Sequence, residues 1–294
     1  MTTMARALAW ILLIAAIALG LGAGAAADRP ARTVGPYTVL AADFHVHSFP
    51  GDGGLLPWDI ADEARRRSLD VIALTNHNSM WSWRLAQRFA PFDRRLIVLP
   101  GVELTSAGYH MATVDVRAPV AWRQSAASAV AAVHAQGGIA IAAHPRSPRP
   151  SKYDDAAIDV LDGFEAASSN DTVAENAAFS RRAVIRRPTI AAIGSSDFHY
   201  FAPLGVSRTF VFAADRSAAA VLEAIRKGRT VACDGLGDTY GPAELAAAVA
   251  GECRRVAVAS PEGWRRRDGL ATAGAWVALV LLVLLGARER QSVA

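Results

Sequence analysis

The chain has 294 residues, of which 52% are hydrophobic and 20% charged, and its formal net charge is +4 at pH 7. This composition describes a globular domain that carries apolar, membrane-type segments. The arginines are scattered along the chain and do not form one patch. A solvated surface is therefore favoured, and no nucleic-acid partner is expected.

The first segment of the chain predicts a signal peptide. Residues 7–27 contain no charge, follow Arg6 and end in the small-residue stretch GAGAAAD, which offers cleavage sites of the form Ala-x-Ala. We therefore expect residues 1–27 to form a cleavable signal peptide, with an uncleaved membrane anchor as the alternative.

A second apolar segment lies near the other end. Residues 269–287 are 19 uncharged residues, about the length that crosses the hydrocarbon of a bilayer, and they predict a C-terminal transmembrane helix. Five arginines between positions 254 and 267 precede this segment, whereas Arg288 and Arg290 follow it. The positive-inside rule alone would place the domain in the cytoplasm. Because the first segment usually sets the orientation, we expect an extracytoplasmic, periplasmic domain anchored to the cell membrane, with the cytoplasmic side as the alternative.

Between these ends, residues 36–235 alternate short β-branched runs with longer amphipathic runs. The predicted strands are residues 37–43, 70–74, 96–100, 110–116, 139–143, 161–166, 189–193 and 209–212. The predicted helices are residues 57–68, 80–89, 120–135, 172–185 and 217–227. This alternation predicts an α/β fold with a mainly parallel sheet, and eight strands favour a barrel. Residues 236–268 predict a small cap or linker before the C-terminal helix.

Most histidines of the chain follow predicted strands, where a parallel barrel assembles its site. The nine candidate metal ligands are His45, His47, Asp52, His77, Glu103, His110, His144, Asp197 and His199. A lone histidine at a strand end is more often structural. Six of the seven histidines together with three carboxylates would cost several kcal/mol to bury without a metal. The set therefore predicts a metal centre.

The ordered motifs resemble a known family. HxH with a downstream Asp-Gly, then TxH, GxE, HP and DxH, occur in this order between residues 38 and 213. This order resembles the polymerase and histidinol phosphatase (PHP) superfamily. The resemblance implies a distorted (β/α)7 barrel, in which one of the eight predicted strands is an extra or edge strand. It also implies up to three divalent metal ions, commonly zinc, manganese or iron.

The resemblance further implies how the ligands are shared among the metals. One metal would be held by His45, His47, Glu103 and Asp197, a second by Glu103, His110 and His144, and a third by Asp52, His77 and His199. The usual TDH motif reads TNH here, with Asn76 in place of an aspartate. An amide can orient a neighbour by hydrogen bonding, but it carries no negative charge and takes no proton. This departure motivates one alternative, a metal-binding sensor with a degenerate site.

Clustered divalent metals predict hydrolysis. They would lower the pKa of a water and neutralise charge on a phosphoryl group, so we expect a metal-dependent phosphoesterase that acts on a small phosphorylated molecule. His199, His144 and Asp197 are the candidate catalytic residues, and either histidine is a candidate proton donor to the leaving oxygen. Arg146 and Arg208 are candidates to bind the substrate phosphate, with surface arginines as the alternative. Hydrolysis of another bond, such as an amide, stays open.

Five further residues are predicted to lie outside the ligand set. Glu165 ends a strand on the same rim and is expected to stand behind the ligands, and Asp43 is expected to orient a histidine or brace the first loop. Cys233 and Cys253 can pair in one disulfide if the domain lies outside the cytoplasm. His134, on an alanine-rich segment without a partner motif, is expected on a helix surface.

Overall fold

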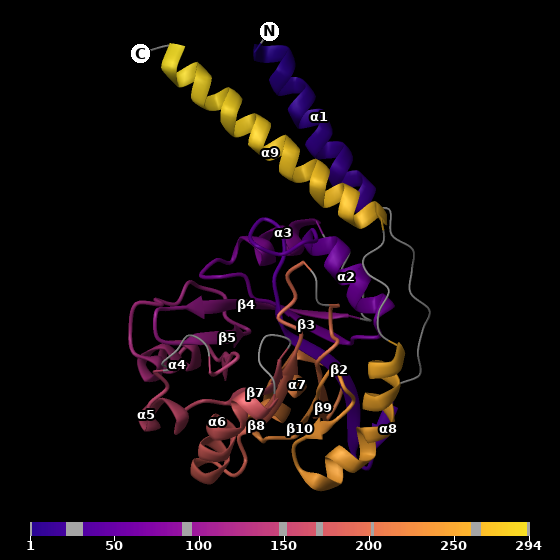
Figure 1. Ribbon diagram of the computed structural model, residues 1–294, viewed down its shortest axis with the longest axis vertical. Coiled ribbons are helices and arrows are strands. Elements are labelled where there is room, and N and C mark those ends of the chain that lie inside the picture. Colours follow the sequence, from indigo (N-terminus) through magenta and orange to yellow (C-terminus); the bar gives the residue numbers. More distant parts are fainter. Residues whose placement is uncertain are drawn as a thin grey trace.

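A computed structural model describes the protein over residues 2–21, 32–89, 96–146, 152–168, 173–200, 203–259 and 266–292. These residues form an α/β barrel, from one end of which two long helices project side by side (Figure 1). The predicted signal-peptide cleavage sites, between residues 23 and 27, lie outside the described residues.

Seven strands follow one another around the barrel in chain order. They are β2 (Tyr37–Val46), β3 (Val71–Leu74), β4 (Ile97–Thr105), β5 (His110–Val114), β6 (Ile139–Ala142), β7 (Gly163–Ser168) and β8 (Ala191–Ser195). All run in the same direction except β5, which is antiparallel to both of its neighbours. A parallel bridge between Val46 and Phe198 joins the end of β2 to the segment after β8. The barrel is therefore nearly closed.

The remaining strands extend the sheet beyond β2. β9 (Arg208–Ala213) is antiparallel to β2, followed by β10 (Thr230–Cys233) and β11 (Thr239–Tyr240), while the short β1 (Arg32–Val34) also pairs with β2. β9 is thus the extra strand that the family resemblance implied. β8 approaches β9 so closely that a Cβ at Gly194 would lie 2.3 Å from the carbonyl oxygen of Arg208. Only glycine permits this contact.

Helices cover the outside of the barrel and one of its ends. They are α2 (Pro57–Arg66), α3 (Trp81–Phe89), α4 (Ala126–His134), α5 (Asp155–Ile158), α6 (Val173–Arg186), α7 (Ala218–Arg226) and α8 (Ala243–Ala259). α7 shares a buried cluster with Leu40, Val71 and Ile139, which lie where their parallel strands begin. α7 therefore closes the end of the barrel opposite the candidate ligands. A disulfide between Cys233 and Cys253 joins β10 to α8.

The predicted elements are present, with three differences. The helix predicted from residue 120 begins only at Ala126, because the Ser125 side chain accepts a hydrogen bond from the Ser128 amide and caps the first turn. The sheet is less parallel than predicted, because β5 and β9 run against their neighbours. The elements that were not predicted are β1, β10, β11 and α5, which are very short and carry little periodicity, and α8, which lies within the predicted cap or linker.

The two projecting helices are α1 (Thr2–Leu21) and α9 (Arg266–Ser292). They run antiparallel, so that both ends of the chain lie at the tip that is distant from the barrel (Figure 1). The segment Asp268–Gly286 of α9 is long and apolar enough to cross a bilayer by length and composition, and α1 contains the shorter apolar segment Met4–Leu19.

Candidate metal centre

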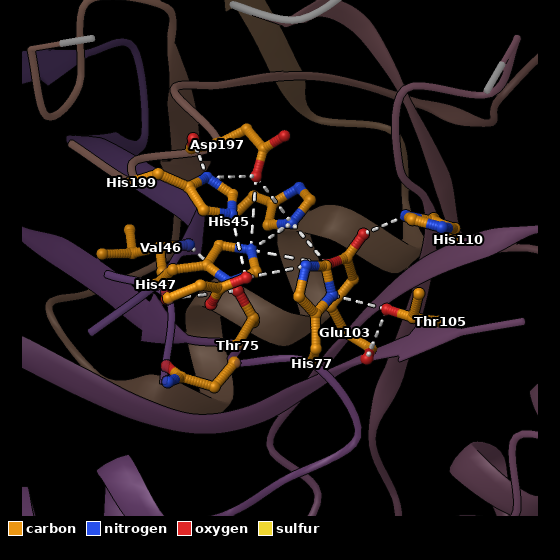
Figure 2. Close-up of polar contacts among 12 residues, drawn as sticks. His45, Val46, His47, Thr75, His77, Glu103, Thr105, His110, Asp197 and His199 are labelled. Atoms are coloured by element: carbon orange, nitrogen blue, oxygen red, sulfur yellow. Dashed lines mark hydrogen bonds and ion pairs between the residues drawn. The ribbon is translucent and has the colours of Figure 1, made fainter. Parts of the chain in front are cut away.

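The nine predicted ligands lie together at the end of the barrel where the parallel strands finish. His45 is the penultimate residue of β2 and Glu103 lies near the end of β4. Loops after β2, β3, β6 and β8 carry the other ligands that follow strands, and His110 begins β5. Figure 2 shows imidazoles from several strands turned towards the carboxylates of Glu103 and Asp197. Their role as metal ligands stays a prediction, while the structure supplies the geometry.

A bulge in β2 turns the HxH motif inwards. The pairing of β2 with β3 shifts register between Asp43 and Val46. Before this irregularity Ala41 packs in the outer layer against α2, and after it Val46 packs in the same layer. The change of alternation therefore directs His45 and His47 towards the inside of the barrel. Bulges commonly re-aim side chains next to functional sites.

Two further ligands have a strained backbone. His144 and Asp197 have φ angles of 25° and 47°, in the left-handed region that non-glycine residues seldom adopt. Both lie two residues after the end of a strand, β6 and β8 respectively. Such strain costs of the order of 1–3 kcal/mol per residue and clusters at functional sites. Here it turns each side chain back across the open end of the barrel.

The buried inner part of the centre is formed by His45, His47, Glu103 and Asp197. The Nε2 atoms of His45 and His47 lie 3.1 Å apart, and each lies 3.2 Å from Oδ1 of Asp197. Oε2 of Glu103 is 3.5 Å from the first of these nitrogens and 3.4 Å from the second. Two imidazole nitrogens and two carboxylate oxygens thus converge on one point.

Glu103 also faces the histidines on the other side of the barrel. Its Oε1 atom is 2.7 Å from Nδ1 of His110 and 3.2 Å from Nε2 of His144, and its Oε2 atom is 2.5 Å from Nδ1 of His77. With His45 and His47, five imidazoles therefore lie within 3.5 Å of this one carboxylate. This position suits a ligand shared between metals.

Asp52 organises an outer part, nearer to solvent. Its Oδ1 atom is 3.0 Å from Nδ1 of His47, and its Oδ2 atom is 3.0 Å from Nε2 of His77 and 3.4 Å from Nε2 of His199. His47 thus has one ring nitrogen in the outer part and the other in the inner part. The structure groups the donors into four overlapping sets of three or four residues that could each hold an ion.

The donor chemistry fits divalent metals. Nδ1 of His45 faces Glu165 at 2.9 Å and Nδ1 of His47 faces Asp52 at 3.0 Å, so in the neutral rings these nitrogens carry the protons. The two Nε2 atoms then point bare lone pairs at each other and at Asp197. Such an arrangement is repulsive unless a cation or additional protons occupy it. Mixed imidazole and carboxylate donors suit zinc, manganese or iron and do not choose among them.

The pKa values of the ligands in the absence of metal reflect the same close approach of histidines and carboxylates. Burial alone would raise the pKa of Glu103, but the surrounding histidines hold this pKa well below its usual range. Burial would lower the pKa of His45, yet Asp197 and Glu103 raise it well above the usual value. For His77, hydrogen bonds to Asp52 and Glu103 outweigh burial and raise the pKa to about 10. Without metal, the centre therefore binds protons, which a metal would have to displace.

Residues behind the ligands hold them in place. Glu165 accepts a hydrogen bond from the His144 amide at 2.7 Å in addition to its contact with His45, which is the supporting position predicted for it. Asp43 accepts hydrogen bonds from the amides of His45 and Ser196, so it braces the first loop. Burial raises the pKa of Asp43 to about 6.

Two supporting residues were not predicted from the sequence. The Oγ1 atom of Thr105 lies 2.6 Å from Nδ1 of His77 (Figure 2). The buried Tyr153 hydroxyl donates to the carbonyl oxygen of His110. Thr105 could have been found, because it lies two residues after Glu103 on the same strand and so shares its face. Tyr153 has no such signal, since it reaches the site from a loop more than 40 residues away from His110.

Asn76 has a structural role that an aspartate could not perform. Its Oδ1 atom accepts a hydrogen bond from the Ser48 amide at 2.9 Å, and its Nδ2 atom donates to the carbonyl oxygens of Ser48 and Pro50 at 2.5 and 3.3 Å. The amide thus fastens the loop that carries Asp52. The departure from the family motif leaves the nine predicted ligand positions intact.

The two predicted phosphate-binding arginines differ in their surroundings. Arg146 is half-buried two residues beyond His144. Arg208 is buried and donates to the carbonyl oxygens of Gly205, at 2.7 Å, and Arg67, at 3.1 Å. These contacts describe a structural role between β9 and the end of α2 and do not support the predicted phosphate contact. His134 lies exposed on α4, as expected, and its Nε2 atom pairs with Asp162 at 2.8 Å.

Comparisons with known proteins concern the family and the fold of the chain. Residues 180–230 match the PHP-associated family model. The fold is similar to that of a two-domain protein from Bacteroides vulgatus ATCC 8482 that contains a predicted PHP-like metal-dependent phosphoesterase, with 23% identity over 72% of this chain and 69% of that chain and a TM-score of 0.55. The lesion-specific endonuclease PfuEndoQ from Pyrococcus furiosus is also similar, with 17% identity, coverage of 64% and 56%, and a TM-score of 0.47. No curated protein matches the chain.

The family match and the shared barrel confirm the resemblance to the PHP superfamily that the motifs predicted.

Proposed function

We propose that the protein is a metal-dependent phosphoesterase that hydrolyses a small phosphorylated substrate with two or three divalent ions, zinc, manganese or iron. The observation that carries this proposal is the convergence of five imidazoles on the carboxylate of Glu103. A centre built around one shared carboxylate fits several adjacent cations better than a single isolated one. Neighbouring divalent cations lower the pKa of a bound water and neutralise charge that develops on a phosphoryl group.

The roles that we assign to the residues of the centre follow their burial. Glu103 and Asp197 are buried, and their negative charges would offset those of the cations. His144 and His199 are the candidate proton donors to the leaving oxygen. The His199 side chain is 30% exposed, whereas that of His144 is 6% exposed. Because a donor must reach the substrate, we assign this role to His199 in the state in which its imidazole is protonated and not bound to a metal ion.

Arg146 is the better of the two candidates to contact the substrate phosphate. It is half-buried two residues after the candidate ligand His144, whereas Arg208 is buried and donates to backbone carbonyls between β9 and α2. A guanidinium can bind two phosphate oxygens at once.

We also propose an extracytoplasmic location for the barrel. The disulfide between Cys233 and Cys253 supports this location, because structural disulfides persist mainly in oxidising compartments. Mass analysis of the alkylated protein, purified from membranes without reductant, would find both cysteines unmodified if they are paired. Two alkylated cysteines would argue for the cytoplasmic alternative.

Metal content and turnover test the function. Full-length protein in detergent is expected to contain two or three metal ions per chain and to hydrolyse p-nitrophenyl phosphate or bis-p-nitrophenyl phosphate. The double variant His45→Ala, His47→Ala should lose both properties. His134→Ala is the matched control, since this histidine lies outside the centre and pairs with Asp162.

Each other outcome points to a different function. Metal with turnover of amides but not of phosphate esters would favour the amide hydrolase. Metal without any turnover would favour the sensor, although the contacts of Asn76 remove its original motivation. Absence of metal from the unmodified protein would refute the proposal.

A further inference from the structure

The two projecting helices contact each other through small, buried side chains. Ala16 of α1 and Ala271, Ala275 and Ala278 of α9 are almost fully buried. A Cβ at Gly274 would lie 3.3 Å from the Cβ of Ala16. Small residues of this kind let two helix backbones approach closely, as they do in membranes.

The outward faces of both helices are apolar and exposed. Large side chains on these faces include Leu8, Ile11 and Ile14 of α1 and Val277, Val280, Val283 and Leu284 of α9. Soluble proteins rarely expose so large a contiguous apolar surface, so a partner must cover it. Between Asp268 and Gly286, 19 residues of α9 would span about 28 Å at 1.5 Å per residue, close to the thickness of bilayer hydrocarbon. Lipid acyl chains are the occupant that fits this length.

The base of the helix pair stands on the loop between β2 and α2. Phe49, Leu56 and Trp58 of this region share one buried cluster with Ala16 and with Ala271 and Ala275. The rings of Phe49 and Trp276 meet edge to face, with centroids 5.0 Å apart. The helices are therefore seated on the barrel and not merely tethered to it.

The same loop reaches the metal centre on its other side. A hydrogen bond from the Phe49 amide to the carbonyl oxygen of Leu55, 2.8 Å long, closes the loop, and Asp52 lies within it. Asp52 contacts His47 and His77 of the centre. The helix pair and the candidate ligands thus share one end of the barrel.

We infer that α1 is retained and pairs with α9 as an antiparallel hairpin in a lipid bilayer, holding the ligand-bearing end of the barrel at the membrane surface. Both ends of the chain then lie across the bilayer from the barrel. This differs from the cleavable signal peptide expected from the sequence, because cleavage would remove the partner that buries the alanines of α9. The inference does not depend on the enzymatic activity.

Cysteine crosslinking in the full-length chain tests the hairpin. The double variant Ala16→Cys, Gly274→Cys introduces two cysteines whose Cβ atoms would lie 3.3 Å apart. This distance is slightly below the Cβ–Cβ range of about 3.5–4.5 Å that is usual for a disulfide. Ile14→Cys with Gly274→Cys is the control, since Ile14 is 62% exposed. A protease site inserted at Arg117, between β5 and α4, would separate α1 from α9 and keep the native Cys233–Cys253 disulfide within one fragment.

After oxidation in membranes and proteolysis, the first pair should keep the two fragments joined on a non-reducing denaturing gel, and the control pair should not. Intact mass of the unsubstituted protein should show that the residues of α1 are present, and alkaline carbonate should not extract it. A processed N-terminus, release by carbonate, absence of the crosslink, or a crosslink only between two copies would each overturn the inference. The mass and extraction results stand even if a cysteine variant fails to fold.

Discussion

The inner and outer parts of the candidate metal centre differ in burial and in the elements that hold them. Glu103, in the inner part, lies on a strand and its side chain is fully buried. Asp52, which organises the outer part, lies on a loop and its side chain is 39% exposed, and His77 and His199 beside it are also partly exposed. Strands carry His45 and Glu103 of the inner part, whereas the outer donors Asp52, His77 and His199 all lie in loops.

This difference in burial predicts which part binds metal more tightly and which part contacts the substrate. Buried donors have no water with which to form hydrogen bonds, so the inner part should bind metal most tightly. Loss of one inner donor should therefore reduce metal binding most. Exposed donors can change position and are accessible from solvent, so the outer part should face the substrate. The following variants test this division.

The largest effect is expected for Glu103→Gln, which removes the charge shared by five histidines. Metal content should fall below one ion per chain, and turnover should fall by more than about 100-fold, beyond the range typical of a supporting residue. Metal analysis and phosphatase assays measure both. Glu223→Gln, on the exposed face of α7, is the control. Retention of all metals would contradict the central position of Glu103.

A smaller effect is expected for Asp52→Asn. The inner part should keep its metal while the outer part loses one ion, with a fall in turnover of about 10–100-fold. Titration of metal into the chelated protein should then show one binding step fewer than in the unmodified protein. Asp215→Asn, in an exposed bend before α7, provides the comparison. If Asp52→Asn emptied the whole centre, the division into two parts would be wrong.

A smaller effect again is expected for substitution of Thr105, which supports a ligand. Thr105→Val removes the hydroxyl next to Nδ1 of His77. Loss of this orienting contact should weaken metal affinity at the outer part by about 10-fold and leave the inner part unchanged. Competition with a metal-sensing dye would measure the two affinities. Thr33→Val, on the exposed edge strand β1, should alter neither affinity.

The smallest effect concerns the pH dependence of the chelated protein. Its His77 has a pKa raised to about 10, because hydrogen bonds to Asp52 and Glu103 outweigh burial, while histidine in an unfolded chain titrates near pH 6.5. Between these values the folded state holds more protons, so the free energy of unfolding should decrease as pH rises from about 6.5 to 10. Denaturant unfolding at several pH values would measure this slope. His77→Ala should flatten it, and an unchanged slope would contradict the assignment.

The candidate ligands could be predicted from the sequence because their positions obey a simple rule. Strand ends can be read from periodicity, and in a nearly parallel barrel strand ends converge. The antiparallel direction of β5 and β9 could not be read, because a strand has the same alternation in either direction. The bulge in β2 was also invisible, although it decides which way His45 and His47 point.

Residues whose role depends on tertiary hydrogen bonds were harder to interpret. Asn76 suggested a weakened site, but its amide binds the backbone of the loop that carries Asp52. Arg208 suggested a phosphate ligand, but backbone carbonyls already occupy its guanidinium. Each side chain has a partner in a segment distant in the sequence, Ser48 for Asn76 and Arg67 for Arg208, which the sequence alone does not bring together.

Anomalous diffraction from crystals grown with manganese or zinc would test the central claim most directly. The account predicts two or three metal peaks around the side chain of Glu103, with at least one bound by the Nε2 atoms of His45 and His47. A single peak away from Glu103, or no peak among the nine residues, would contradict it.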